Sequence, residues 1–154
     1  METTSKAIET LNDLIEINND RVAGFEKASQ DLENSDFELQ GLFGKLASES
    51  RNNVSELTNA VSRHGAEPET GSSTSGAIHR AWIDVKATFG GSDRKSILEE
   101  CERGEDAIKK AYVSALDPEN ELSQEEADLV RTQQQGINAG HDQIKALRDS
   151  QSPD

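Results

Sequence analysis

The sequence predicts an all-α protein: a four-helix bundle in which two antiparallel hairpins are joined by a long crossover. Three observations lead to this fold class. Apolar residues recur every three or four positions along four long stretches of the chain. Glycine and proline interrupt these stretches at few places. Aromatic residues make up only 4% of the 154 residues, which argues against an aromatic-rich β-sandwich.

The first hairpin is predicted from residues 4–33 and 36–64. Each stretch carries its apolar side chains in a helical stripe. Polar residues interrupt the stripes, Asn18 in the first helix and Ser50 and Asn53 in the second. Because the connection between the two helices is very short, we expect them to be antiparallel neighbours.

The second hairpin is predicted from residues 93–116 and 123–149. Glu105 is in phase with the apolar stripe of the first of these helices. Gln133, Gln134 and His141 lie on or beside the stripe of the second, and of the two glutamines Gln134 is taken as the core candidate. The break at Asp117–Leu122 is the predicted turn.

Two helix starts carry capping signals. Asp36 stands where an N-cap residue is expected, and its carboxylate can accept a backbone N–H of the first turn. Ser123-Gln-Glu-Glu126 has the pattern of a capping box, in which Ser123 and Glu126 satisfy each other's backbone N–H groups.

The connection between the hairpins, residues 66–92, is much longer than the roughly two to eight residues that usually join bundle helices. Its first part is rich in Gly, Ser and Thr, whereas residues 76–89 are amphipathic. We expect a short crossover helix there, anchored on the bundle by Trp82. One long crossover is the connectivity of ferritin-like bundles. Residues 1–150 then form one domain, and residues 151–154 form a disordered tail.

The polar residues inside the stripes are the candidate site. They are Asn18, Ser50, Asn53, Glu105, Gln134 and His141. Ferritin-like di-metal proteins hold their metals with a Glu on each of two helices and a Glu-x-x-His pair on each of the other two. Most of this ligand chemistry is missing here. We therefore interpret the six residues as a hydrogen-bonded layer that fixes helix register.

Only Glu105 and His141 remain as weak candidates for metal ligands, and one carboxylate cannot neutralise two divalent cations. Helical phase predicts that Asp20 and Asp106 face outward and that Glu102 lies on the flank of its helix. No cofactor is favoured, and iron or another divalent metal is the alternative. No catalytic residue is predicted.

The formal net charge of −14 disfavours binding to nucleic acid and to anionic membranes, because both need a basic surface. The N-terminus does not have the pattern of a secretory signal, and no window is apolar enough to span a membrane. Cys101 is the single cysteine, and its place on the apolar stripe predicts a buried, inert thiol. These features predict a cytoplasmic protein.

Several segments resemble a bacterial ferritin-like family of unknown function, named for a Pseudomonas four-helix-bundle protein. The specific parts are His79-Arg-Ala-Trp82 and Cys101-Glu-Arg-Gly-Glu-Asp106, and similarity runs from about residue 7 to residue 150. The resemblance implies a ferritin-like bundle with a crossover helix. It implies no activity.

We therefore expect a non-enzymatic bundle with a polar core, either stress-associated or an interaction protein. One alternative is a metal-binding redox protein with a reduced ligand set. Another is a module that binds an amphipathic helix of a basic partner in a groove between the crossover helix, beside Trp82, and the bundle. A homo-oligomer, most simply a dimer, is expected from small residues beside the stripes. These are Ala23, Ala28 and Ala60.

Overall fold

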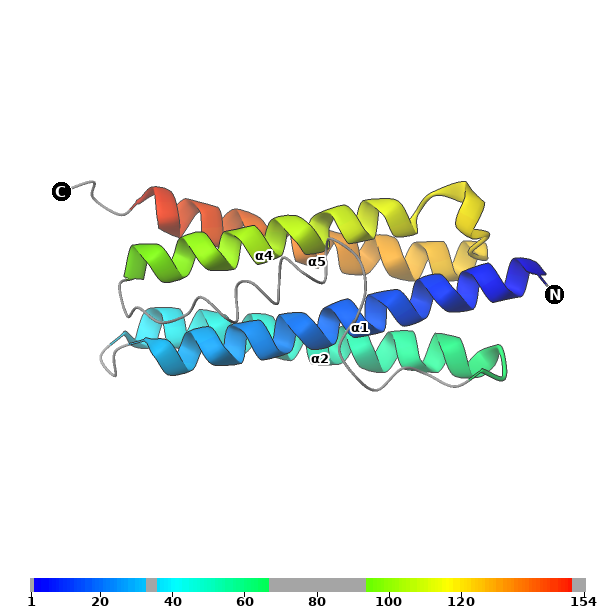
Figure 1. Ribbon diagram of the computed structural model, residues 1–154, viewed down its shortest axis with the longest axis horizontal. Coiled ribbons are helices and arrows are strands. Elements are labelled where there is room, and N and C mark those ends of the chain that lie inside the picture. The colour runs from blue at the N-terminus through cyan, green and yellow to red at the C-terminus, as the bar shows by residue number, and fades with distance from the viewer. Residues whose placement is uncertain (1, 33–35, 67–93, 151–154) are drawn as a thin grey trace.

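The computed structural model describes residues 2–32, 36–66 and 94–150, and these residues form an all-helical bundle (Figure 1). Its helices are α1 (Glu2–Asp31), α2 (Phe37–Arg63), α4 (Arg94–Ala115), the short 3-10 helix η1 (Pro118–Asn120) and α5 (Gln124–Asp149). The described residues form four long helices and no strand, as the fold-class prediction required. The predicted crossover helix at 76–89, its anchor Trp82 and the tail 151–154 lie outside the described residues.

Each long helix is antiparallel to the helices that it contacts. In Figure 1, α1 and α5 run in one direction and α2 and α4 in the other. The helix α1 contacts both α2 and α4, and α5 contacts both α4 and α2. None of the described helices is both long enough and apolar enough to cross a membrane.

The two predicted caps are confirmed. The Asp36 side chain accepts the backbone N–H of Leu39 at the start of α2. At the start of α5, the Ser123 hydroxyl accepts the N–H of Glu126, and the Glu126 carboxylate accepts the N–H of Ser123. These bonds satisfy backbone donors that have no partner within the helix.

The turn between α4 and α5 is held by its own side chains. Asp117 accepts the backbone N–H of Glu119, and Pro118 begins η1. The Asn120 amide donates to the last carbonyls of α4, those of Ser114 and Ala115, at 2.8 and 3.1 Å. The turn therefore satisfies the end of α4 before the chain enters α5.

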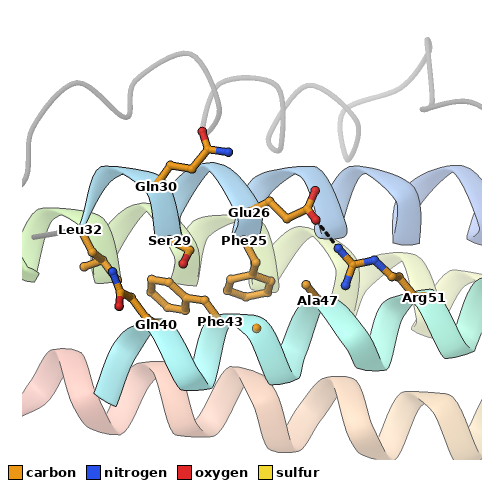
Figure 2. A pocket seen from close by; sticks show the side chains of 10 residues that line it. Phe25, Glu26, Ser29, Gln30, Leu32, Gln40, Phe43, Ala47 and Arg51 are labelled. Carbon is orange, nitrogen blue, oxygen red and sulfur yellow. Dashed lines mark hydrogen bonds and ion pairs between the residues drawn. The ribbon is translucent and has the colours of Figure 1, made fainter. Parts of the chain in front are cut away.

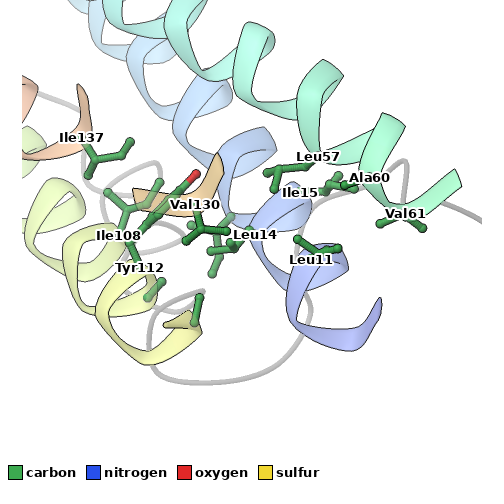
Figure 3. Close-up of a cluster of buried hydrophobic side chains, with 13 residues drawn as sticks. Leu11, Leu14, Ile15, Leu57, Ala60, Val61, Ile108, Tyr112, Val130 and Ile137 are labelled. Atoms are coloured by element: carbon green, nitrogen blue, oxygen red, sulfur yellow. The ribbon is translucent and has the colours of Figure 1, made fainter. Parts of the chain in front are cut away.

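Two apolar clusters fill the bundle, one toward each end. The first includes Phe25, Phe43, Leu46, Ile97, Cys101 and Ile144. The second includes Leu11, Ile15, Leu57, Ile108, Tyr112, Val130 and Ile137 (Figure 3). On every long helix the two sets are separated by a short polar stretch, which places a polar layer at mid-bundle.

The helix α1 buries a wider arc than its apolar stripe indicates. Asp20, which the stripe placed on the outer face, is completely buried, so that expectation was wrong. The helix α1 contacts two neighbours, α2 and α4, so its buried surface is wider than that of a helix packed against one. Ala28 and Ala60 are also buried within the chain and are not available for contact with a second copy.

Candidate functional site

A buried arginine occupies the centre of the polar layer. Arg21 follows Asn18 by three positions on α1 and is 0% exposed. Its guanidinium carbon lies 5.4 Å from the centroid of the Phe25 ring. Burial of a charge is unfavourable unless the charge is paired and hydrogen-bonded, so its partners decide what the site can do.

Two carboxylates and a hydroxyl pair with this guanidinium. Nε and Nη2 of Arg21 donate to the two oxygens of Glu105 on α4, both at 2.8 Å, and Glu105 is also 0% exposed. Nη1 donates to Glu49 at 2.8 Å and to the Ser50 hydroxyl at 3.0 Å, both on α2. We call Arg21, Glu49, Ser50 and Glu105 the mid-bundle cluster.

The pKa of Arg21 reflects this pairing. Burial alone would lower it, but the charges and hydrogen bonds of Glu105, and then those of Glu49, raise it above its ordinary value. The guanidinium therefore stays protonated at every pH at which the bundle is folded. It can act as a fixed positive charge and hydrogen-bond donor, but not as a general acid or base.

A chain of hydrogen bonds continues from the cluster into the second apolar region. The Ser50 hydroxyl donates to the side-chain oxygen of Asn18, Oδ1, at 2.9 Å. The Asn18 amide donates to the Tyr112 hydroxyl at 2.8 Å, and Tyr112 donates to Gln133 at 2.8 Å. All four long helices are therefore linked through buried polar side chains.

Two further bonds complete the chain. The side-chain amide of Asn53 donates to the same side-chain oxygen of Asn18 at 3.2 Å. The Gln133 amide donates to the backbone carbonyl of Asn53 at 3.3 Å and to Glu56 at 3.1 Å. Burial raises the pKa of the Tyr112 hydroxyl above its ordinary value, although the bond from Asn18 opposes this. Tyr112 is therefore a neutral donor at physiological pH.

The comparison with known families adds the family but no activity. Residues 6–118 match the family described as Domain of unknown function (DUF2383). The chain belongs to this family. The match spans α1, α2 and α4 and so includes Arg21, Ser50 and Glu105, whereas α5 lies beyond it. No curated protein matches the chain.

In this DUF2383 protein, four of the six predicted polar residues lie in the polar layer. Asn18, Ser50, Asn53 and Glu105 are buried and belong to the mid-bundle cluster or its hydrogen-bond chain. Gln134 is only half-buried. Gln133, the other glutamine beside the stripe, enters the layer instead, while the stripe residues Val130, Ile137 and Ile144 are buried as predicted.

The two weak metal candidates have different partners in the DUF2383 chain. Both oxygens of Glu105 accept bonds from Arg21. His141 is buried, and its Nε2 lies 2.6 Å from Oδ1 of Asp106. Glu102 lies next to the same pair, with its ligand atom and theirs within 4.8 Å of one another. We call Glu102, Asp106 and His141 the edge site.

Sequence reasoning missed Arg21 and Glu49. Charged residues were assigned to solvated faces, and the partners of Arg21 lie on helices that are distant in sequence. One signal was present: Arg21 lies three positions after Asn18 and four before Phe25, which is helical spacing along one face. Cys101 is buried as predicted, and burial, with Glu105 and Glu100 nearby, raises the pKa of its thiol well above the usual range.

An open groove lies between α1 and α2 (Figure 2). It has a volume of about 530 Å³, and the aromatic rings of Phe25 and Phe43 meet in it with their centroids 5.4 Å apart. Glu26 and Arg51 form an ion pair on its wall. Both rings are buried, Phe25 at 0% and Phe43 at 1% exposure, so the accessible walls of the groove are mainly polar.

Proposed function

We propose that this protein is a non-enzymatic, ferritin-like bundle whose centre is held together by an ion-pair cluster in place of a metal centre. The direction of the helices supports the ferritin-like part. Because α2 and α4 run in the same direction, the end of α2 and the start of α4 lie at opposite ends of the bundle, as in folds with one long crossover.

The observation that carries the proposal is the bonding of Arg21 to Glu105 and Glu49. A di-metal centre of the ferritin-like type balances its two dications with four carboxylates. The mid-bundle cluster has two carboxylates, and Arg21 already neutralises one of their charges. Two dications beside a permanent guanidinium charge would be strongly unfavourable in a buried site.

Iron loading tests this proposal. The purified chain is incubated with ferrous iron, dialysed and analysed for metal, and oxygen uptake is followed during loading. The same measurement on His141→Gln separates the centre from the edge site. We expect no catalysed iron oxidation and no iron retained by His141→Gln. Two irons per chain retained by that variant would contradict the proposal.

A second candidate function is binding of a basic, amphipathic helix. The groove between α1 and α2 supports it because it provides a hollow of about 530 Å³ along two helices. The net charge of −14 supports it because an acidic surface attracts a basic partner. The alternative groove predicted beside Trp82 lies outside the described residues.

Two glycines of α2 give a matched test. Gly44 lines the groove and Gly41 does not, and a Cβ added at either would meet no atom within 4 Å. Binding of a fluorescent basic amphipathic peptide is measured by anisotropy. We expect Gly44→Trp to block it and Gly41→Trp to leave it unchanged. Equal effects of the two substitutions would exclude this groove.

The proposal also includes a homodimer in the cytoplasm. With Ala28 and Ala60 buried inside one chain, of the three predicted small residues only Ala23 keeps partly exposed surface. Light scattering coupled to gel filtration gives the mass in solution, and a monomer at all concentrations would refute the dimer.

A further inference from the structure

The edge site brings three possible metal ligands together at one side of the α4–α5 hairpin. Glu102 and Asp106 are one helical turn apart on α4, so their side chains lie on the same face. His141 comes from α5. One ligand atom from each residue lies within 4.8 Å of the other two.

The bonding of His141 leaves its Nε2 without a hydrogen bond close to the carboxylates. His141 is only 7% exposed, and its Nδ1 lies 3.3 Å from Oδ1 of Asp142 in hydrogen-bond geometry. The neutral tautomer that donates from Nδ1 to Asp142 has an unprotonated Nε2. That Nε2 is buried, lies 2.6 Å from Asp106 and has no aligned hydrogen-bond partner.

Glu102 shows the same incomplete bonding. Its Oε1 is buried and has no aligned hydrogen bond, although Nη1 of Arg148 lies 2.7 Å away. Two carboxylate oxygens and an imidazole nitrogen therefore lie within 4.8 Å of one another. Arg148 supplies a positive charge at Glu102, and a metal ion would supply one between His141 and Asp106.

We propose that Glu102, Asp106 and His141 bind one divalent transition-metal ion of the zinc class. Three protein ligands made of imidazole and carboxylate, with a further position open, are typical of zinc sites that retain a water. The imidazole favours zinc and its neighbours in the first transition row over Mg²⁺ and Ca²⁺, which prefer oxygen ligands. The two carboxylates balance the charge of the ion, which the mid-bundle cluster cannot do.

The surroundings of the site allow an ion to enter and be held. A hollow of about 550 Å³ reaches the site at Asp106, and its other lining residues are Lys109, Lys110, Val113 and Ser114. The side chain of Arg148 is 31% exposed and also pairs with Asp149, so it can release Glu102 while keeping a partner. The carboxylate of Asp142 behind His141 resembles the outer-shell groups that orient metal-bound histidines.

The ligand atoms are close enough for small side-chain movements to form the site. With metal–ligand bonds of about 2.1 Å, ligand atoms on one ion stand about 3.0 to 3.4 Å apart. Nε2 of His141 and Oδ1 of Asp106 must therefore separate by a few tenths of an ångström. The side chain of Asp106 is 52% exposed, which leaves it free to make that movement.

Titration of the purified chain with Zn²⁺ tests the proposal. Calorimetry should show one ion per chain, and the carbon-bound ring protons of His141 should shift in NMR spectra. We expect His141→Gln and Asp106→Asn each to weaken binding at least tenfold. Asp142→Asn, which removes only the outer-shell partner, should weaken it roughly 10- to 100-fold. Circular dichroism checks that each variant is folded.

His64→Gln is the matched control. His64 also contacts a carboxylate, that of Glu126, but among the described residues the pair belongs to no group of three possible metal ligands. It should bind Zn²⁺ like the unmodified chain. The proposal is overturned if no saturable binding occurs or if Zn²⁺ leaves the His141 ring signals unchanged. It is equally overturned if His141→Gln and Asp106→Asn bind as tightly as the original chain.

Discussion

Arg21 and Glu105 form a bidentate ion pair between α1 and α4 in which neither side chain is exposed to solvent. Its net contribution to stability is small, because the desolvation of both ions offsets most of their attraction. Its geometry is specific, since the planar guanidinium must face both carboxylate oxygens at once. The pair therefore fixes the axial position of α1 relative to α4 between two apolar clusters that would tolerate a slip.

Removal of Arg21 should be strongly destabilising. Arg21→Met leaves the carboxylate of Glu105 buried and unpaired, and loss of one partner of a buried ion pair costs about 3–5 kcal/mol. The free energy of unfolding from urea titration measures it. Arg51→Met is the control: Arg51 pairs with Glu26 at the surface, where such pairs contribute about 0–1 kcal/mol.

A double-mutant cycle measures the interaction between Arg21 and Glu105 separately from what each residue contributes alone. If Glu105 is the group left unsatisfied, Arg21→Met combined with Glu105→Leu should recover much of the loss, because apolar replacements can substitute for a buried ion pair. Additive losses in the double variant would show that the two residues act independently, contrary to this account.

Gly140 leaves room for the pair, and its replacement should be destabilising. A Cβ there would lie 2.8 Å from Nη2 of Arg21 and 3.0 Å from a methyl carbon of Leu46. Alanine usually stabilises a helix by about 1 kcal/mol relative to glycine, so a net loss in Gly140→Ala would reveal the clash. Gly44→Ala is the control, because its Cβ meets nothing within 4 Å, and we expect it to raise the melting temperature.

The helices of this protein could be predicted because their determinants are local. The apolar spacing, the Asp36 cap and the Ser123–Glu126 box all act within a few residues of one another. The mid-bundle cluster could be predicted only in part. Asn18 and Ser50 interrupt apolar stripes and so indicate a polar layer, but nothing near Arg21 in the sequence reveals that Glu105 lies opposite.

The edge site depends on how α4 and α5 lie against each other, which sequence periodicity does not define. The predicted phase of α5 is right, since Val130, Ile137 and Ile144 are buried. Asp106 faces outward as predicted, and its side chain is 52% exposed. Periodicity could not show that His141, on the other helix, lies next to it, because that contact depends on the axial alignment of the two helices.

Tyr112 should be an essential link in the hydrogen-bond chain. Tyr112→Phe removes one of the two acceptors of the Asn18 amide, which keeps the Leu14 carbonyl, and the donor to Gln133. An unsatisfied buried polar group costs about 1–3 kcal/mol. Urea unfolding measures the loss. A cycle with Gln133→Leu should show coupling between the two residues, whereas strictly additive losses would contradict the link.

The ionisation of Tyr112 gives an independent measurement of its burial. Tyr112 is the only tyrosine of the chain, so the ultraviolet absorbance of tyrosinate reports on it alone. Because burial raises the pKa of Tyr112, the folded protein should show no tyrosinate at pH 10.0, the ordinary pKa of the group. Its contribution to stability is present below that pH and is lost as pH rises further. Titration of folded protein at pH 10.0 would contradict the buried placement.

Glu126 should make stability depend on pH in the acid range. Burial would raise the pKa of its carboxyl, but the hydrogen bond from the Ser123 N–H and the contact with His64 lower it below the ordinary value of 4.5. A lowered pKa in the folded state means that the charged form is favoured by folding. The stabilisation is therefore present above pH 4.5 and disappears as pH falls through the folded-state pKa.

The substitution Glu126→Gln isolates this charge while keeping an acceptor for Ser123. We expect a loss of about 1 kcal/mol at neutral pH, typical of an N-terminal capping interaction, shrinking as pH falls below the ordinary carboxyl value. Glu125→Gln is the matched control, because it removes the same charge from the same helical turn but its side chain is 82% exposed. Urea unfolding at a series of pH values measures both variants. An equal loss for Glu126→Gln at neutral and acid pH would show that the carboxylate charge does not stabilise this helix start.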